Sequence, residues 1–341
     1  MSAAGLVWAE FALCVIVIGF AGVKLTVYGD AIADKTGMGG SWVGLVLIAT
    51  VTSLPELAAG VTASAVALLP DIAAGDALGS CVYNLFILAI LDLFTRRQPV
   101  LALARREHVL SAGFSMLLVG LAALGLMAAQ AGVSGLSGHI AWSTPLIVLV
   151  YIGAIRTLHG FQESEVEEFT EEEPDAFAGR SLTDISIRYA IAAAFVVAAG
   201  IWLPFVSDDI SKVMGWQQSF TGTIFTALST SLPELVVTLA ALRIGAIDMA
   251  VGNVLGSNMF NMLVLAIDDI VYFPGSIYAD VSPGHLVSGL SALTMTAAIV
   301  TALYLRPRQR VLGIGGWASL ALIALFALNT WLMYHLGVDG V

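Results

Sequence analysis

The hexapeptide Thr52-Ser53-Leu54-Pro55-Glu56-Leu57 occurs twice in this chain, since residues 230–235 repeat the sequence TSLPEL 178 positions later. A second block follows each copy at an offset of 177, so one extra residue separates the two blocks in the first copy. In it, Asp71, Gly75, Gly79, Ser80, Asn84 and Asp92 match Asp248, Gly252, Gly256, Ser257, Asn261 and Asp269. An internal repeat of this kind predicts two halves built on one structural plan.

The composition around these motifs is that of a membrane protein. Of the 341 residues, 58% are hydrophobic and only 11% are charged, and the mean hydropathy is +0.91. A soluble domain carries about a quarter charged residues. The apolar residues form long blocks, each able to cross ~30 Å of hydrocarbon as a helix. The fold class is therefore an all-α polytopic membrane protein.

Ten membrane-spanning helices are predicted, and the basic residues set their direction. The predicted spans are 5–27, 40–69, 72–94, 107–129, 140–158, 186–205, 219–243, 248–271, 285–305 and 312–335. With the N-terminus outside, 13 of the 14 Lys and Arg residues fall on the inner side, and only Lys212 falls outside. Basic residues favour the cytoplasmic side of a membrane. We therefore expect a multi-pass protein of the plasma or inner membrane with both termini outside.

The domain organisation follows from the span count. Residues 1–158 form a first five-helix half, and residues 183–341 form a second. Because five is odd, the second copy crosses the membrane in the opposite direction, which gives the inverted-topology repeat of many secondary transporters. Residues 159–182 join the halves and carry eight acidic residues from Glu163 to Asp175. A solvated cytoplasmic linker explains this segment, since it has no calcium-binding EF-hand spacing.

The repeated glutamates point to a cation site. A carboxylate near the middle of a bilayer costs at least ~2.5–3.5 kcal/mol unless it is paired or hydrated. Glu56 and Glu234 occupy equivalent positions, and no Lys or Arg lies near them in the sequence. A bound cation is the simplest partner for both.

Pro55 and Pro233 are expected to break the helices that carry these glutamates. Proline lacks an N–H and its ring opposes the carbonyl of residue i−4. Freed carbonyls at membrane depth are tolerated only where they line a buried or wet cavity. Further oxygens would come from Ser80 with Asn84 and from Ser257 with Asn261, each pair four residues apart on one helical face.

The pooled donors are hard oxygens: two carboxylates, two amides, hydroxyls and main-chain carbonyls. No Cys or His belongs to the set, which disfavours zinc and copper and suits calcium, sodium or magnesium. Magnesium retains its waters, so calcium is the better divalent candidate. Competition of calcium and sodium for one site, open to each side in turn, would give obligatory exchange.

These motifs resemble the two alpha-repeats of the cation/calcium exchanger superfamily, specifically the sodium/calcium exchangers. The repeated TSLPEL and the GNVLGSNMFN of residues 252–261 carry the resemblance. It implies that Glu56 and Glu234 are the central cation ligands and that the first and sixth spans form a long, tilted, sliding pair. It also implies further oxygens from Thr52, Ser53, Ser80, Thr230, Ser231 and Ser257, and from the main-chain carbonyls of Ala49 and Ala227.

The chain departs from the family pattern at two positions of the first copy, and at a third, position 261, branches of the family differ. The first copy reads GDALGSCVYN over residues 75–84, so Asp76 and Cys81 replace the asparagines found at 253 and 258. These changes alter either helix packing or the polarity of the cation path. Position 261 is Asn, whereas potassium-dependent relatives carry Asp there. The predicted site thus holds two carboxylates.

The sequence leaves other transport activities open. A buried glutamate can carry a proton, so a proton/calcium exchanger is the first alternative, and sodium exchange for another divalent cation is the second. A channel would need a continuous pore, and an enzyme would need a nucleophile or substrate gate that no motif supplies. We expect no cofactor, no nucleic-acid binding, and only Ca²⁺, Na⁺ and the lipid bilayer as partners. The oligomeric state cannot be read from the sequence.

Overall fold

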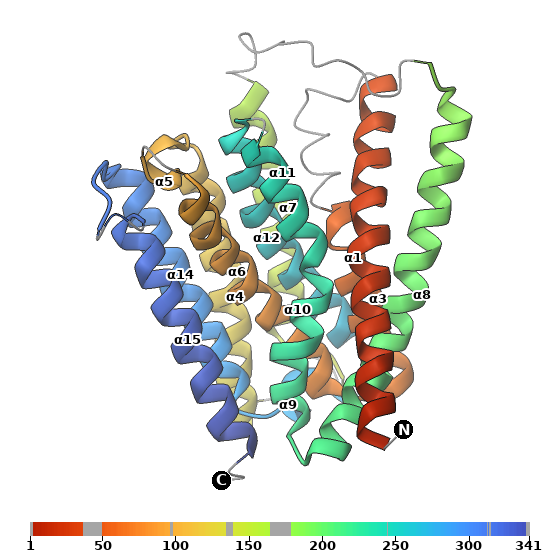
Figure 1. Cartoon of the computed structure of the whole chain (residues 1–341). Coiled ribbons are helices and arrows are strands. Elements are labelled where there is room, and N and C mark those ends of the chain that lie inside the picture. Colours follow the sequence, from red (N-terminus) through yellow and green to blue (C-terminus); the bar gives the residue numbers. More distant parts are fainter. Residues whose placement is uncertain are drawn as a thin grey trace.

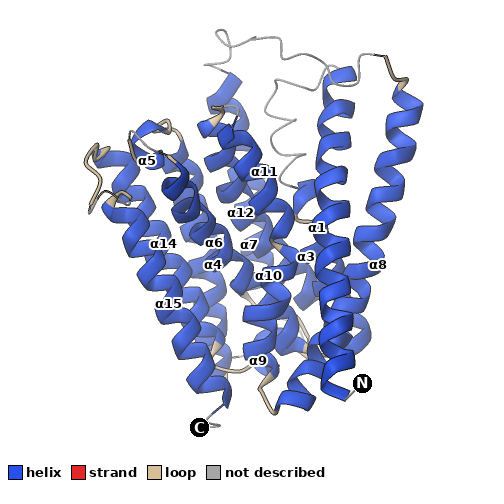
Figure 2. Ribbon diagram, in the orientation of Figure 1, coloured by secondary structure: helices blue, strands red, loops and turns tan. Residues whose placement is uncertain are grey.

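The computed structural model of the chain describes residues 3–36, 50–95, 98–133, 139–163, 179–243, 245–311, 313 and 315–338. Its helices are α1 (Ala3–Lys35), α3 (Leu54–Val61), α4 (Pro70–Phe94), α5 (Val100–Leu103), α6 (His108–Gln130), α7 (Ser143–Glu163), α8 (Leu182–Met214), α9 (Gln218–Thr221), α10 (Ala227–Thr230), α11 (Leu232–Arg243), α12 (Ile247–Val271), α13 (Ile277–Asp280), α14 (His285–Leu305) and α15 (Trp317–Val338), with π-helices η1 (Thr62–Ala67) and η3 (Gly222–Thr226). Within these ranges there is no β-strand, and Figure 2 shows a bundle of helices and loops only.

Seven of these helices are long and apolar enough to cross a membrane. An eighth crossing results if Gln218–Thr230 and Leu232–Arg243, which are bent by 43° at Ser231, count as one span. Two shorter apolar helices, Leu54–Ala67 and Ser143–His159, coincide with the remaining predicted spans. The all-helical membrane class is confirmed, and part of the predicted span 40–69 lies outside the described residues.

The helices α1 and α8 are longer than the sequence predicted, with 33 residues each. They pack against each other along one side of the bundle, as Figure 1 shows. Hydropathy underestimates their length, because Lys35 in α1 and Asp208 and Lys212 in α8 lie beyond the apolar segments without ending the helix. Asp208 explains how one helix end is stabilised, since it accepts hydrogen bonds from Lys212 Nζ and from Gln218 Nε2 (2.7 Å).

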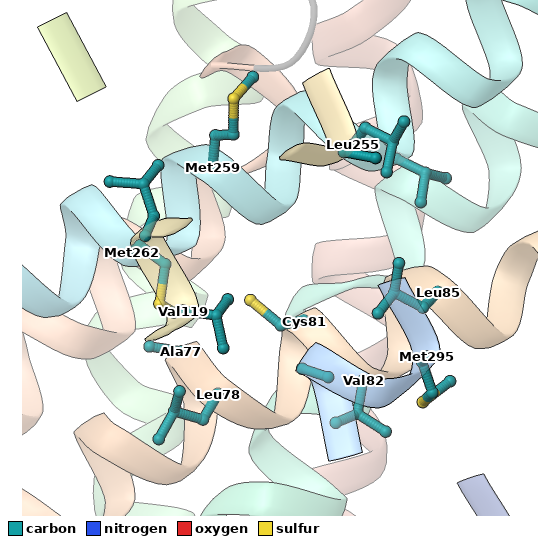
Figure 3. Packing of buried hydrophobic residues seen from close by; sticks show 14 of the residues in the cluster. Ala77, Leu78, Cys81, Val82, Leu85, Val119, Leu255, Met259, Met262 and Met295 are labelled. Atoms are coloured by element: carbon teal, nitrogen blue, oxygen red, sulfur yellow. The ribbon is translucent and has the colours of Figure 1, made fainter. Parts of the chain in front are cut away.

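The centre of the bundle is formed by α4 and α12, the most buried of the candidate spans. They pack against each other, and α12 also packs against α6 while α4 packs against α14. Figure 3 shows this apolar packing, with Ala77 and Cys81 of α4 near Met262 of α12 and Val119 of α6. The polar residues of the second repeated block, Ser80 with Asn84 and Ser257 with Asn261, therefore lie on the two innermost helices.

Two histidine–aspartate contacts join the halves in a reciprocal way. His285 Nε2 lies 2.9 Å from Asp71 Oδ1, and His108 Nε2 lies 3.0 Å from Asp248 Oδ1. Asp71 and Asp248 are repeat counterparts, and the two histidines are also 177 residues apart. Each aspartate also accepts a main-chain N–H, from Ser282 (2.7 Å) and from Arg105 (2.7 Å) respectively. Each half thus fixes the start of the other half's central helix.

Both termini lie at one end of the bundle, and α5 lies at the other (Figure 1). We call these the terminal end and the α5 end. The helix α4 runs from the terminal end to the α5 end, and α12 runs back in the opposite direction. Since η1 leads from α3 into the start of α4, residues that follow Glu56 in α3 lie toward the terminal end.

Candidate cation site

The helices that carry the two glutamates are broken where the prolines predict. Ser53 forms a turn between residue 52 and the start of α3 at Leu54, and Ser231 forms a turn between α10 and α11. In both copies the break lies two residues before the proline. Each glutamate follows a proline at the beginning of a helix, where main-chain N–H groups lack intrahelical partners. The predicted breaks are confirmed, and they place Glu56 and Glu234 at new helix starts.

Glu234 is held by residues from both halves of the chain. Its Oε1 accepts a hydrogen bond from Ser53 Oγ of the first copy at 2.9 Å and from Ser257 Oγ of the second copy at 3.4 Å. All three side chains are fully buried. Because the TSLPEL serine reaches across to the other glutamate, the two motifs form one composite site.

A second polar contact joins the halves through Thr230. Its Oγ1 lies 3.3 Å from Ser80 Oγ and donates to Asp76 Oδ1 at 2.7 Å. Asp76 is 1% exposed. From the sequence, Asp76 is only a departure from the family pattern. In the structure it contacts Thr230, one of the predicted ligands. The signal that could have identified it is an acidic residue one turn from Ser80 on the same face of the helix.

Several predicted ligands are buried without hydrogen-bond partners in the described part of the chain. They include both carboxylate oxygens of Glu56, Oε2 of Glu234, and the amide oxygens and nitrogens of Asn84 and Asn261. Buried polar atoms in proteins nearly always have a partner, and each exception calls for an explanation. Two carboxylates without hydrogen-bonded cationic side chains are costly in a dry core. A cation bound between them would remove that cost.

The remaining predicted ligands are placed as follows. Thr52 and Ser231 are buried. The main-chain oxygen of Ala227 accepts hydrogen bonds from Ser231 N (3.1 Å) and Thr230 Oγ1 (3.3 Å). Ala49 lies outside the described residues.

The hydrogen-bond partners seen at the glutamates are hydroxyl groups. Glu234 accepts from Ser53 and Ser257. Among the residues that the structure describes, no three His, Cys, Asp or Glu side chains are grouped so as to hold a metal ion. Hydroxyl, amide and carboxylate oxygens suit calcium and sodium.

Glycines bring the long helices α1 and α8 against the broken ones. A Cβ at Gly22 of α1 would lie 2.5 Å from Cγ of Pro233, and a Cβ at Gly200 of α8 would lie 2.8 Å from Cβ of Ala58. The two glycines are 178 residues apart, so they are repeat counterparts. Each long helix therefore contacts the broken helix of the other half, next to its glutamate.

The predicted G-xxx-G approach is also observed in the first copy. A Cβ at Gly75 would lie 2.7 Å from the main-chain N of Thr223, and a Cβ at Gly79 would lie 2.6 Å from the Thr223 oxygen. These contacts place α4 directly against η3. The absence of side chains at both glycines thus brings Ser80 close to Thr230.

The repeat counterparts Asp92 and Asp269 bind the loops next to the ends of their helices. Each is buried and saturated with donors from the protein. The Asp92 carboxylate accepts from Val100 N (2.8 Å), Gly316 N (2.6 Å), Ser319 Oγ (2.7 Å) and Thr95 Oγ1 (3.2 Å). The Asp269 carboxylate accepts from Ala141 N (2.8 Å), Thr144 Oγ1 (2.5 Å), Ser276 Oγ (2.9 Å) and Ile277 N (2.9 Å). These contacts make them caps that organise the loops.

Comparison with known proteins gives consistent results. The fold resembles that of the sodium-calcium exchanger NCX_Mj, with a TM-score of 0.61 and 20% identity over 95% of this chain and 98% of that one, in a structure soaked with Na⁺ and Sr²⁺. The chain is 39% identical to the sodium/calcium exchanger MaX1 of Methanosarcina acetivorans over 92 residues, which are 26% of this chain and 25% of that protein. It is 26% identical to the inner membrane protein YrbG of Escherichia coli (strain K12) over 239 residues, which are 69% of this chain and 70% of that protein.

The family model described as sodium/calcium exchanger protein matches residues 6–156 and 187–335. The two matched segments cover most of the chain and leave out the acidic linker between them. The chain therefore belongs to the sodium/calcium exchanger family.

Proposed function

We propose that the protein is a secondary-active antiporter that exchanges Ca²⁺ for Na⁺ at one shared site. The observation that carries this proposal is the composite site in which Ser53 of one half donates to Glu234 of the other. Two buried glutamates offer two negative charges, which one divalent ion or two monovalent ions can neutralise. Both kinds of cation cannot fill the site fully at once, so loading with one displaces the other.

The ligands of this site come equally from both copies. We propose that they are Glu56, Glu234, Thr52, Ser53, Ser80, Asn84, Thr230, Ser231, Ser257 and Asn261, with main-chain oxygens from Ala49 and Ala227. The orphaned carboxylate and amide atoms among them support this assignment. No cofactor is needed, since the ions themselves are the transported ligands.

The architecture that would give alternating access is a pair of inverted five-helix halves. Residues 1–158 and 183–341 are the proposed halves, joined by a cytoplasmic linker of residues 159–182. The opposite directions of α4 and α12, which are repeat counterparts, support inversion. The two halves would cross the plasma or inner membrane ten times in total, with both termini outside. The pair α1 and α8, which contacts both broken helices, is the element we expect to slide.

The test is calcium uptake into proteoliposomes under an imposed sodium gradient. Glu56→Gln and Glu234→Gln should each abolish sodium-driven uptake, because one remaining charge cannot neutralise a divalent ion. Glu172→Gln in the linker is the matched control, since it removes the same charge away from the site. Near wild-type uptake by either site variant, in protein that remains monodisperse, would refute the shared site.

A proton is the alternative counter-ion. Its support is that the Glu56 carboxylate has no hydrogen-bond partner among the described residues, an arrangement that a protonated acid also tolerates. Vesicles loaded with sodium, or with protons in sodium-free buffer, distinguish the two. Calcium uptake driven by protons alone would replace sodium in the proposal.

A further inference from the structure

A second buried acid lies on α12, two turns beyond Asn261. Asp268 is 0% exposed, and neither of its carboxylate oxygens has a hydrogen-bond partner in the described ranges. Its neighbour Asp269 has four donors, so the missing partners are a property of position 268 and not of this helix end. A buried carboxylate without donors is costly, which makes it a candidate ligand for a cation.

Asp268 lies directly against the main chain of α3. A Cβ at Gly60 would be 2.5 Å from Oδ2 and 2.8 Å from Oδ1 of Asp268, closer than any side chain could come. Gly60 lies one turn beyond Glu56 toward the terminal end. The helix then widens into the π-helix η1, which packs against α12 and carries the buried, unpartnered hydroxyl of Ser64.

Two buried positions at the terminal end are acidic, whereas their counterparts in the other copy are neutral. Asp76, near the start of α4, and Asp268, near the end of α12, are both buried at this end. The repeat counterpart of Asp268 is Leu91, and that of Asp76 is Asn253.

The counterpart of Gly60 also belongs to a neutral group. This counterpart is Thr238, whose Oγ1 accepts a hydrogen bond from Asn253 Nδ2 at 3.1 Å. At the α5 end the three positions thus hold a hydrogen-bonded hydroxyl–amide pair and a leucine. At the terminal end they hold two acidic residues and a glycine, so the acidic character belongs to one side only.

We propose that Asp268 binds a sodium ion on the terminal-end side of the shared site. A monovalent ion suits this position, because Asp268 supplies a single carboxylate and a divalent ion would keep an uncompensated positive charge there. Asp268 is not among the proposed ligands of the shared site, and its counterpart at the α5 end is Leu91, which offers no ligand for a cation. Its role in transport rests on the proposed function, but its occupancy by sodium does not.

The experiment measures equilibrium binding of ²²Na⁺ to the purified full-length protein in calcium-free buffer. Asp268→Asn preserves shape and should bind one fewer Na⁺ per chain than the wild type. The matched control is Asp209→Asn, which removes an exposed acid near the C-terminal end of α8. It should bind the same number of Na⁺ ions per chain as the wild type. An unchanged number and affinity in Asp268→Asn would show that this acid is buried in its protonated form, and the proposal would be wrong.

A second variant keeps the proposal testable if Asp268→Asn does not fold. Gly60→Ala places a methyl group against the carboxylate oxygens and should lower sodium affinity at least several-fold at this site. Wild-type sodium binding by a monodisperse Gly60→Ala protein would also overturn the assignment. Because no transport is measured, these outcomes are independent of calcium uptake by Glu56→Gln and Glu234→Gln.

Discussion

The side-chain Nδ2 of Asn258 donates a hydrogen bond to the main-chain oxygen of Cys81 at 3.2 Å, and Cys81 Sγ lies 3.7 Å from the main-chain oxygen of Asn258. These residues are 177 positions apart, so each contacts its own repeat counterpart. In a pair of related halves, a position can meet its counterpart only where the halves meet on their common axis. The crossing of α4 and α12 therefore marks the centre of the molecule.

Removing this central hydrogen bond should destabilise the bundle and leave the proposed cation ligands in place. Asn258→Ala deletes the donor and leaves the buried Cys81 oxygen unpaired on that side, at a cost of about 1–3 kcal/mol. The measurement is the midpoint of thermal unfolding in detergent. Cys81→Ala is the control, because its main-chain oxygen remains in place. A midpoint for Asn258→Ala equal to that of the control would contradict the prediction.

Asp76 should raise the affinity of the proposed site for calcium. Asp76→Asn keeps an oxygen that can accept from Thr230 but removes the charge beside the predicted ligands. The calcium concentration for half-maximal exchange should rise roughly tenfold, which corresponds to about 1.4 kcal/mol. Asp209→Asn provides a control for the loss of one charge elsewhere. An unchanged half-saturating concentration would restrict Asp76 to a packing role.

The contacts of Gly22 and Gly200 should be sensitive to a single methyl group. At 2.5 Å and 2.8 Å, a new Cβ would overlap Pro233 and Ala58, and overpacking of this kind costs about 1–3 kcal/mol. Gly22→Ala and Gly200→Ala should therefore lower both thermal stability and the exchange rate. Gly113→Ala is a matched control, since no atom lies within 4 Å of its added Cβ. Equal effects in all three variants would show that the close contacts are unimportant.

Asn261 should set the dependence on potassium and pH. With a neutral amide here, we expect sodium-driven calcium exchange that needs no potassium. Asn261→Asp adds a carboxylate to a site that already holds Glu56 and Glu234, and repulsion in the unloaded site should make exchange more pH-dependent. By similarity to the potassium-dependent relatives, the variant should also gain a potassium requirement.

The measurement for Asn261 is calcium flux across a pH series, with and without potassium, for both proteins. A strict potassium requirement in the unmodified protein would exclude Asn261 from the site. The same conclusion would follow from an identical pH profile in the variant.

The predicted orientation can be tested by labelling single cysteines with an impermeant thiol reagent. Cysteines placed at Ser2 and Asp339 should react from outside intact cells, and one at Ser164 should react only after the cells are opened. The reason is the strong partition of Lys and Arg to one side of the predicted topology. Labelling at 164 in intact cells, with none at 2 and 339, would reverse the orientation.

The sequence predicted those features that depend on local chemistry. The breaks before Pro55 and Pro233 follow from the proline ring, and the burial of both glutamates follows from their place in apolar segments. The close approach of α4 to η3 follows from the spacing of Gly75 and Gly79. Each of these can be read from a few neighbouring residues.

Features that depend on contacts between the halves could not be predicted in this way. Ser53 bonds to the glutamate of the other copy, and the contact of Asp76 with Thr230 joins residues 154 positions apart. The π-helices also have no sequence signal, since they result from packing. Asp268 is an intermediate case. The repeat in the sequence aligns it with Leu91, but only the structure shows that its carboxylate is buried without a hydrogen-bond partner among the described residues.

The contact between Cys81 and Asn258 also has an evolutionary consequence. In a dimer of two identical chains, a residue on the two-fold axis faces itself, and every substitution appears in both subunits at once. Encoding both copies in one chain removes that restriction, so position 81 can hold Cys while position 258 holds Asn. Acidic residues could likewise accumulate at 76 and 268 without appearing at 253 and 91. Fusion of the copies thus permits selection to act on the two faces of the membrane independently.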